Sequence, residues 1–122
     1  MANPNFFILY VDNPPASASF YTTLLERPPV ESSPGFAMFA LDSGVMLGLW
    51  KRQEVMPVVD NVGAGAEVAF AVKDDAAVDE LHATWRTRGL PILQQPVRLD
   101  FGYTFVAQDP NGHRLRVFAA GG

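Results

Sequence analysis

The sequence predicts an α+β fold in which one βαβββ unit occurs twice, over residues 5–51 and 66–118 of a single domain spanning residues 1–122. Two observations predict it. The order of β-rich runs, amphipathic segments and turn residues is the same in both halves, and corresponding residues keep a nearly constant spacing. A chain of 122 residues is long enough to bury one core. Residues 52–65 are expected to link the units, with Gly63 and Gly65 supplying flexibility.

The first unit begins with a predicted strand, the run "NFFILYVDN" at residues 5–13, which is rich in β-formers and ends in turn residues. Residues 14–27 predict a helix, because proline and small capping residues precede apolar side chains on one face. The helix stops at "RPPV", since proline cannot continue it. Residues 35–51 then predict a hairpin with "DSG" at its turn.

The second unit repeats this order. Residues 66–74 predict a strand, and residues 75–89 predict a helix that buries Trp85 and ends with Gly89 as its cap. An extended segment follows at residues 90–99. Residues 102–118 predict a second hairpin, with "DPNG" at its turn.

Few residues are identical between the two units, but residues of similar character occur at equivalent positions in both. At a spacing of 61 residues, Val11 corresponds to Val72; in the hairpins the spacing grows to 67 or 68, so that Phe36 corresponds to Tyr103. Two such units are expected to form a cupped mixed sheet with the helices outside. The inner face of the cup would then line a cavity in which a ligand buries its surface.

The composition excludes several classes of protein. Net charge is −4, and the nine basic residues form no run, so nucleic acid and anionic membrane surfaces are not expected as partners. The first apolar run, "FFILYV", is too short for a signal peptide or a membrane span. Without cysteine there is no disulfide, thiol nucleophile or thiolate metal site. We therefore expect a cytoplasmic protein.

Two stretches, "YVDNPPASASFYTTLL" after the first strand and "DPNGHRLRVF" near the end, carry a family resemblance when they occur together in paired βαβββ units. The chain resembles the glyoxalase/bleomycin-resistance/extradiol dioxygenase (vicinal oxygen chelate) superfamily over nearly its whole length. The segments "LGLWK", "DFGYTF" and "DPNGHRLRVF" are also similar to the small phenazine-antibiotic resistance proteins, which bind griseoluteic-acid-type compounds. The resemblance implies the glyoxalase/bleomycin-resistance fold, and a homodimer whose two cavities are each assembled from both chains.

The resemblance also locates the four metal ligands of the family's enzymes, two in each unit, at Phe6, Gly48, Glu67 and Arg116. Phe6 and Gly48 have no donor atom in a side chain, and Arg116 is a permanent cation. One carboxylate does not hold a specific divalent cation. We therefore expect no metal, no cofactor, no catalytic residues and none of the family's metal-dependent chemistry. We predict instead an ion pair between Glu67 and Arg116.

Strand alternation predicts the other residues of the inner face. If the four positions above point inward, so do Ile8, Tyr10, Met46, Trp50 and Phe118, while Phe101 and Tyr103 border the mouth of the pocket. Gly48 is expected to leave room for a flat ligand between aromatic walls, and Arg116 to need an anion from Glu67 or a ligand. Arg114 is expected to reach solvent. Alternatively, the apolar members pack together and fill the cavity.

Three functions remain open. The first is a binding protein that sequesters a small planar aromatic compound, phenazine-like or otherwise, without chemistry; its antibiotic-resistance role is implied by the resemblance. The alternative is an enzyme of the superfamily that uses no metal or a relocated one, with Glu67 as a general base. The third is a structural or interaction module with a filled cup.

Overall fold

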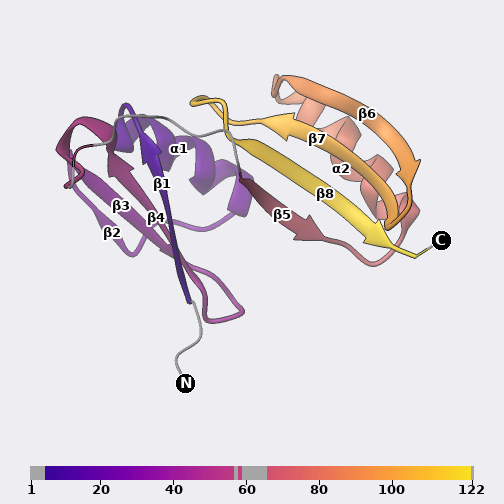
Figure 1. The fold of residues 1–122 in the computed structure, drawn as a ribbon, viewed down its shortest axis with the longest axis horizontal. Coiled ribbons are helices and arrows are strands. Elements are labelled where there is room, and N and C mark those ends of the chain that lie inside the picture. The colour runs from indigo at the N-terminus through magenta and orange to yellow at the C-terminus, as the bar shows by residue number, and fades with distance from the viewer. Residues whose placement is uncertain (1–4, 57, 59–65, 122) are drawn as a thin grey trace. The chain divides into compact units, whose positions relative to one another are not determined.

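A computed structural model describes residues 5–56, 58 and 66–121. The chain divides into two compact units, Met1–Val62 and Gly63–Gly122, and the strands form one four-stranded mixed sheet in each (Figure 1). This confirms the predicted α+β class. Most of the predicted linker, including both of its glycines, lies outside the described residues; its first part forms a short 3-10 helix, η1 (Arg52–Glu54).

The first unit contains, in chain order, β1 (Phe6–Val11), α1 (Pro14–Leu25), β2 (Glu31–Ser32), β3 (Phe36–Ala40) and β4 (Met46–Lys51). The sheet order is β1-β4-β3-β2, with β1 parallel to β4 and the other neighbours antiparallel. Helix α1 begins where sequence predicted, because the Asn13 side chain accepts a hydrogen bond from the Ala16 N–H and Pro14 needs no amide partner.

The second unit contains β5 (Glu67–Ala71), α2 (Asp75–Thr87), β6 (Ile92–Leu99), β7 (Gly102–Gln108) and β8 (Arg114–Ala120). Its sheet order, β5-β8-β7-β6, repeats that of the first unit, again with one parallel pair. Asp74 caps α2 through the Ala77 N–H, and Gly89 follows the helix with a φ of +87°. That left-handed conformation explains why glycine suits this position.

Each helix packs on one face of its own sheet (Figure 1). In the first unit the Tyr21 ring of α1 lies 6.5 Å from that of Phe39, and both side chains are fully buried. In the second unit Trp85 of α2 contacts Phe70 and Phe105, with ring centroids 5.5 and 5.4 Å away. The prediction that Trp85 belongs to the helix core is therefore confirmed. Neither helix, within the described part of the chain, has the length and apolar character needed to cross a membrane.

The strand register tests the spacing between the units. Phe6 lies opposite Met46 in the first sheet, and Glu67 lies opposite Arg114 in the second, which reproduces spacings of 61 and 68 residues. In the hairpins, however, the residue opposite Trp50 is Phe36, whereas the residue opposite Phe118 is Thr104. The spacing is therefore 68 at this position, and the predicted correspondence of Phe36 with Tyr103 is wrong.

The hairpin turns agree with the spacing of 68. The Leu41 N–H donates to the Val45 carbonyl at 2.9 Å, and the Asp109 N–H donates to the His113 carbonyl at 2.9 Å. Both turns thus close with the same hydrogen bond, 68 residues apart. Because side chains alternate between the faces of a strand, the one-residue error in spacing assigns a side chain to the wrong face of the sheet.

Candidate ligand-binding site

The face of each sheet that points away from its helix carries most of the predicted site residues, and we call it the helix-free face. In the first sheet, Phe39 points to the helix and lies opposite Leu47, so the neighbours of Leu47 point away. In the second sheet, Phe105 points to the helix and lies opposite Val117, which gives the same result. The helix-free faces therefore hold Phe6, Ile8, Tyr10, Met46, Gly48 and Trp50 in the first unit, and Glu67, Arg116 and Phe118 in the second.

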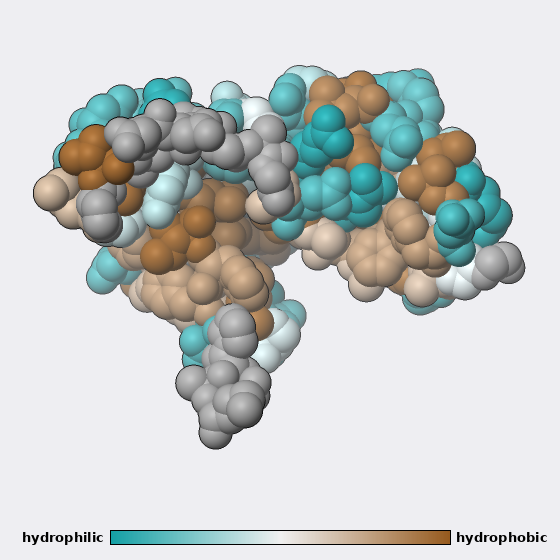
Figure 2. Space-filling view, in the orientation of Figure 1, coloured by the Kyte–Doolittle hydropathy of each residue, from teal (hydrophilic) through white to brown (hydrophobic). Residues whose placement is uncertain are grey.

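Aromatic side chains dominate the helix-free face of the first sheet. Tyr10 and Trp50 are register partners whose rings meet edge to face, with centroids 6.4 Å apart. Phe6 and Ile8 keep 40% and 43% of their surface exposed. Figure 2 shows hydrophobic residues gathered over this part of the molecule. Exposed apolar surface gathered beside aromatic rings marks this face as a candidate interaction surface.

Gly48 does not leave the open slot that the sequence suggested. A Cβ atom built there would lie 2.8 Å from Cε1 of Phe6 and 3.1 Å from Cζ of Phe36. Two phenyl rings therefore already cover the position, and the expectation of free space above Gly48 is wrong. Phe36 was not among the predicted site residues, although its place opposite Trp50 in the hairpin could have identified it.

Glu67 and Arg116 form the predicted ion pair on the second sheet. The Arg116 Nε–H donates to Oε1 of Glu67 at 2.8 Å, and Nη2–H donates to Oε2 at 3.0 Å. This two-bond geometry matches the planar guanidinium to the planar carboxylate and is the strongest arrangement of such a pair. The prediction of an ion pair between these residues is confirmed.

Thr104 and Phe101 hold the same guanidinium from two other directions. The Arg116 Nη1–H donates to the Thr104 hydroxyl at 3.1 Å, and this fully buried hydroxyl donates to the Val117 carbonyl at 2.8 Å. The guanidinium carbon lies 5.6 Å from the centre of the Phe101 ring. Sequence reasoning missed Thr104, which a spacing of 68 from Phe36 would have placed on this face.

Phe101 and Phe118 extend the cluster on the side away from Glu67. Their rings meet edge to face with centroids 6.1 Å apart, and Phe101 is 46% exposed. Phe101 precedes β7 in the chain, but its side chain lies next to those of Arg116 and Phe118, as predicted for a site residue. The arrangement presents two aromatic rings next to a guanidinium whose orientation is fixed.

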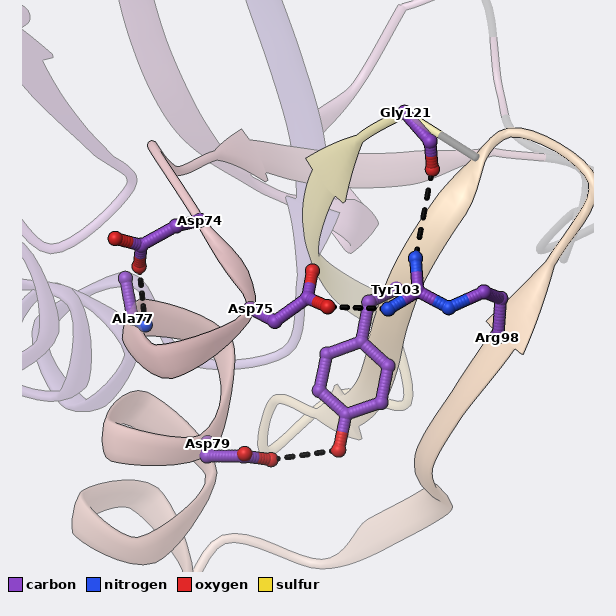
Figure 3. A network of polar contacts seen from close by, with 7 residues as sticks. All are labelled: Asp74, Asp75, Ala77, Asp79, Arg98, Tyr103 and Gly121. Atoms are coloured by element: carbon purple, nitrogen blue, oxygen red, sulfur yellow. Dashed lines mark hydrogen bonds and ion pairs between the residues drawn. The ribbon is translucent and has the colours of Figure 1, made fainter.

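Tyr103 is placed elsewhere. It lies on the helix-covered face, where its hydroxyl donates to the Asp79 carboxylate of α2 at 2.7 Å (Figure 3). This hydrogen bond is the largest cause that raises the pKa of the tyrosine above its ordinary value. The guanidinium of Arg98, which also pairs with Asp75, lies 5.3 Å from the centre of the Tyr103 ring. The structure therefore does not bring Tyr103 together with Phe101 and Phe118, and its prediction as a pocket residue is corrected.

The residues at the four positions where the family resemblance places metal ligands do not fit a divalent cation. Both oxygens of Glu67 already accept hydrogen bonds from Arg116, and Phe6 and Gly48 offer no donor. Within residues 5–56, 58 and 66–121, moreover, no group of three or more acidic or histidine side chains is arranged to hold a metal ion.

The pKa of Glu67 is lowered from its ordinary value of 4.5. The hydrogen bonds from Arg116 are the largest cause; burial acts in the opposite direction, and the charges of Arg116 and Arg114 add to the lowering. A carboxylate with a lowered pKa is a weaker base than an ordinary glutamate. The geometry therefore argues against Glu67 as the general base of an enzyme.

The lowered pKa predicts how the pair contributes to stability at different pH values. A group whose pKa is lower in the folded state stabilises the fold above its unfolded pKa, and this contribution disappears as pH falls through the folded value. We expect Glu67→Gln to reduce the free energy of unfolding at pH 7, and the difference from the wild type to shrink below about pH 4.5. Urea unfolding at pH 7, 5, 4 and 3 measures this.

Glu31→Gln is the matched control, because this exposed glutamate of β2 makes no ion pair within the described part of the chain. It should show little difference from the wild type at any of these pH values. A Glu67→Gln deficit that stays constant down to pH 3 would contradict a stabilising charge on Glu67.

Comparisons with known proteins agree with this fold. Residues 3–117 match the model of the Glyoxalase/Bleomycin resistance protein/Dioxygenase superfamily. The phenazine antibiotic resistance protein EhpR of Enterobacter agglomerans is 27% identical over 117 residues, which cover 93% of this chain and 89% of EhpR. The solution NMR structure of protein ATC0852 from Agrobacterium tumefaciens is 55% identical, covers 100% of both chains and has a TM-score of 0.91.

A more distant structure shows the fold alone. The crystal structure of a glyoxalase-related enzyme from Fulvimarina pelagi is 22% identical, with a TM-score of 0.83, and the match covers 98% of this chain and 88% of that one. The two four-stranded mixed sheets with two helices are thus the glyoxalase/bleomycin-resistance fold.

Proposed function

The chain belongs to the Glyoxalase/Bleomycin resistance protein/Dioxygenase superfamily, and from that membership we propose that it binds a small planar aromatic compound and sequesters it without altering it. The similarity to a phenazine antibiotic resistance protein over nearly the whole chain supports a phenazine-like ligand and a role in resistance. The observation that carries the proposal is the aromatic character of the helix-free faces. In a metal-binding member of the family these faces would instead carry side chains that ligate the metal.

The aromatic side chains on these faces suit a flat ligand. In the first unit, Tyr10 and Trp50 meet edge to face, and in the second unit Phe101 and Phe118 do the same. Rings arranged in this way leave faces and edges available for a further aromatic ring, with which offset or edge-to-face contacts are favourable. Phe6 and Ile8 add apolar surface that is still partly exposed.

The state of the charged residues supports sequestration without chemistry. Glu67 is held by two hydrogen bonds from Arg116 and has a lowered pKa, so it is a poor base. Arg116 donates hydrogen bonds from three of its N–H groups, two to Glu67 and one to Thr104. These contacts fix the shape of the surface, which favours binding over turnover.

The proposal includes a homodimer in which two chains together enclose two cavities, as the family resemblance implies. Light scattering on the purified protein measures its mass in solution. A mass equal to that of one chain, at concentrations where ligand binds, would remove the dimer from the proposal and leave a monomeric binding protein.

The function is tested by titrating the protein with phenazine-1-carboxylate. Trp50 is half-buried on the helix-free face, whereas Trp85 is 2% exposed in the core. In the variant Trp85→Phe, Trp50 is the remaining indole, and its emission should be quenched to saturation. Binding in the micromolar range, on the order of −8 kcal/mol, is expected from contact with a few aromatic rings.

Trp50→Ala should raise the dissociation constant about tenfold, because a buried aromatic contact is lost. Calorimetry measures this loss independently of emission. Cyclohexanecarboxylate, which carries the same acid on a ring that is not flat, serves as the control ligand and should bind at least tenfold more weakly. If no planar aromatic compound binds at millimolar concentration, the proposed function is wrong.

A further inference from the structure

Two phenyl rings meet above Gly48 on the helix-free face of the first sheet. Phe6 belongs to β1 and Phe36 to β3, the two strands that pair with β4 on either side of Gly48. The direct register partners of Gly48 are Ile8 and Met38, so both phenyl rings reach it from diagonal positions. Diagonal neighbours on one face of a sheet lie within reach of an aromatic side chain.

The missing side chain of Gly48 is what gives these rings their place. A Cβ atom there would lie 2.8 Å from Cε1 of Phe6 and 3.1 Å from Cζ of Phe36, closer than packed carbon atoms approach. We call the space directly above the glycine the Gly48 position. It accepts the atoms of a flat ring close to the backbone, and the atoms that fill it now are the outer ends of two side chains, not backbone.

The two rings are not held equally. Phe36 is half-buried on β3, a strand with neighbours on both sides, and it lies opposite Trp50 in the register. Phe6 is 40% exposed on β1, which lies at an edge of its four-stranded sheet. Exposed side chains change rotamer within nanoseconds. Phe6 is therefore the ring that can leave the Gly48 position without any movement of the backbone.

We propose that Phe6 covers a binding position, and that a planar aromatic ligand binds above Gly48 by taking the place of the Phe6 ring. This rests on the proposed function and adds how its site opens. A compound of three fused rings brings more apolar surface to the Gly48 position than the single ring that it displaces, so the exchange is favourable. Trp50, two residues along β4 and in edge-to-face contact with Tyr10, stays beside the ligand.

A residue that covers the position and a residue that only contacts the ligand respond to truncation in opposite directions. Loss of a contact weakens binding, as expected for Trp50→Ala. Loss of a competing ring strengthens it, because the apparent dissociation constant is the intrinsic constant divided by the fraction of molecules in which the position is open. We therefore expect Phe6→Ala to bind phenazine-1-carboxylate about threefold to tenfold more tightly than the wild type. Calorimetry on the full chain measures this.

Phe7→Ala is the matched control. It makes the same chemical change one residue later on β1, at a side chain that is 53% exposed and points to the opposite face of the sheet. Its dissociation constant should equal that of the wild type.

Gly48→Ala tests the position itself. The added methyl group occupies the place of the ligand, so the dissociation constant should rise about tenfold. The double variant Phe6→Ala/Gly48→Ala should bind as weakly as Gly48→Ala, because the methyl group then fills the position in place of the ring. Urea unfolding checks that each variant is folded under the conditions of the titration.

Proton NMR gives a second readout. The Phe6 ring lies over Gly48, so its ring current should shift the α-proton resonances of the glycine, and this shift should be smaller in Phe6→Ala. Saturation with phenazine-1-carboxylate should move the same resonances in both proteins.

Three outcomes would overturn the inference and leave the proposed function standing. They are an affinity of Phe6→Ala that is equal to or weaker than that of the wild type, an unchanged affinity in Gly48→Ala, and a saturated protein whose Gly48 resonances have not moved. If neither the wild type nor Phe6→Ala binds any planar aromatic compound, the proposed function itself fails, and the inference fails with it.

Discussion

Gly102→Ala is expected to destabilise the protein by about 3 kcal/mol or more, because the added methyl group would collide with the neighbouring strand. Gly102 begins β7 with a φ of +147°, and a Cβ atom at this position would lie 2.0 Å from the carbonyl oxygen of Ala119 in β8. The obstacle is paired backbone, which cannot move without breaking the ladder between the strands. Urea unfolding followed by circular dichroism measures the loss.

Gly89→Ala is the control that separates collision from backbone strain. Gly89 also has a positive φ, +87°, but nothing lies within 4 Å of its added Cβ atom. Strain alone should cost about 1–2 kcal/mol. Equal losses in the two variants would contradict a steric role for Gly102.

Because Phe101 is the preceding residue, Gly102→Ala should also weaken ligand binding under conditions where the protein remains folded.

Phe105→Ala is expected to lower the free energy of unfolding by about 3–5 kcal/mol. The Phe105 side chain is fully buried between sheet and helix, with ring centroids 5.4 Å from Trp85 and 5.2 Å from His82. Removing the Phe105 ring leaves a cavity that the two neighbouring rings cannot fill without leaving their own positions. Thermal and urea unfolding both measure this effect.

Phe101→Ala makes the same chemical change four residues earlier and is the matched comparison. Phe101 is 46% exposed and contacts Arg116 and Phe118 on the helix-free face. Its loss should cost less than about 1.5 kcal/mol of stability but should weaken binding of a planar ligand severalfold. Similar stability losses for the two phenylalanines would contradict the assignment of one to the core and the other to the site.

The Glu67–Arg116 pair shows how a repeat can be used to locate a site. Neither residue is unusual by itself, but the two occupy equivalent positions to Phe6 and Gly48 when the units are aligned. Because the family resemblance places metal ligands at these four positions, the sequence predicted that Glu67 and Arg116 meet across 49 residues of chain, and the hydrogen bonds confirm it. When the spacing between equivalent residues of the two units is known, it tells which face of the sheet each side chain points to. Side chains on the same face of neighbouring strands can then contact each other.

The same reasoning failed where the spacing was wrong by one residue. The predicted correspondence of Phe36 with Tyr103 is wrong, because the register aligns Phe36 with Thr104. Tyr103, which was predicted to border the mouth of the pocket, lies on the helix-covered face. Each hairpin turn contains one aspartate and one glycine. A spacing of 67 aligns Asp42 with Asp109, whereas a spacing of 68 aligns Gly44 with Gly112. The hydrogen bonds of the ladder between β7 and β8 and those of the two turns decide in favour of the spacing of 68.

Alternating apolar residues, capping residues and turns determined the order of strands and helices from the sequence alone, because these are local preferences. The positions of the ion pair came from the family resemblance, which places two metal ligands of the family's enzymes at Glu67 and Arg116. Only the tertiary structure decided that Phe6 and Phe36 cover Gly48, and that Thr104 and Phe101 hold Arg116. Those contacts depend on how side chains of different strands fill the space above a sheet, which no local pattern specifies.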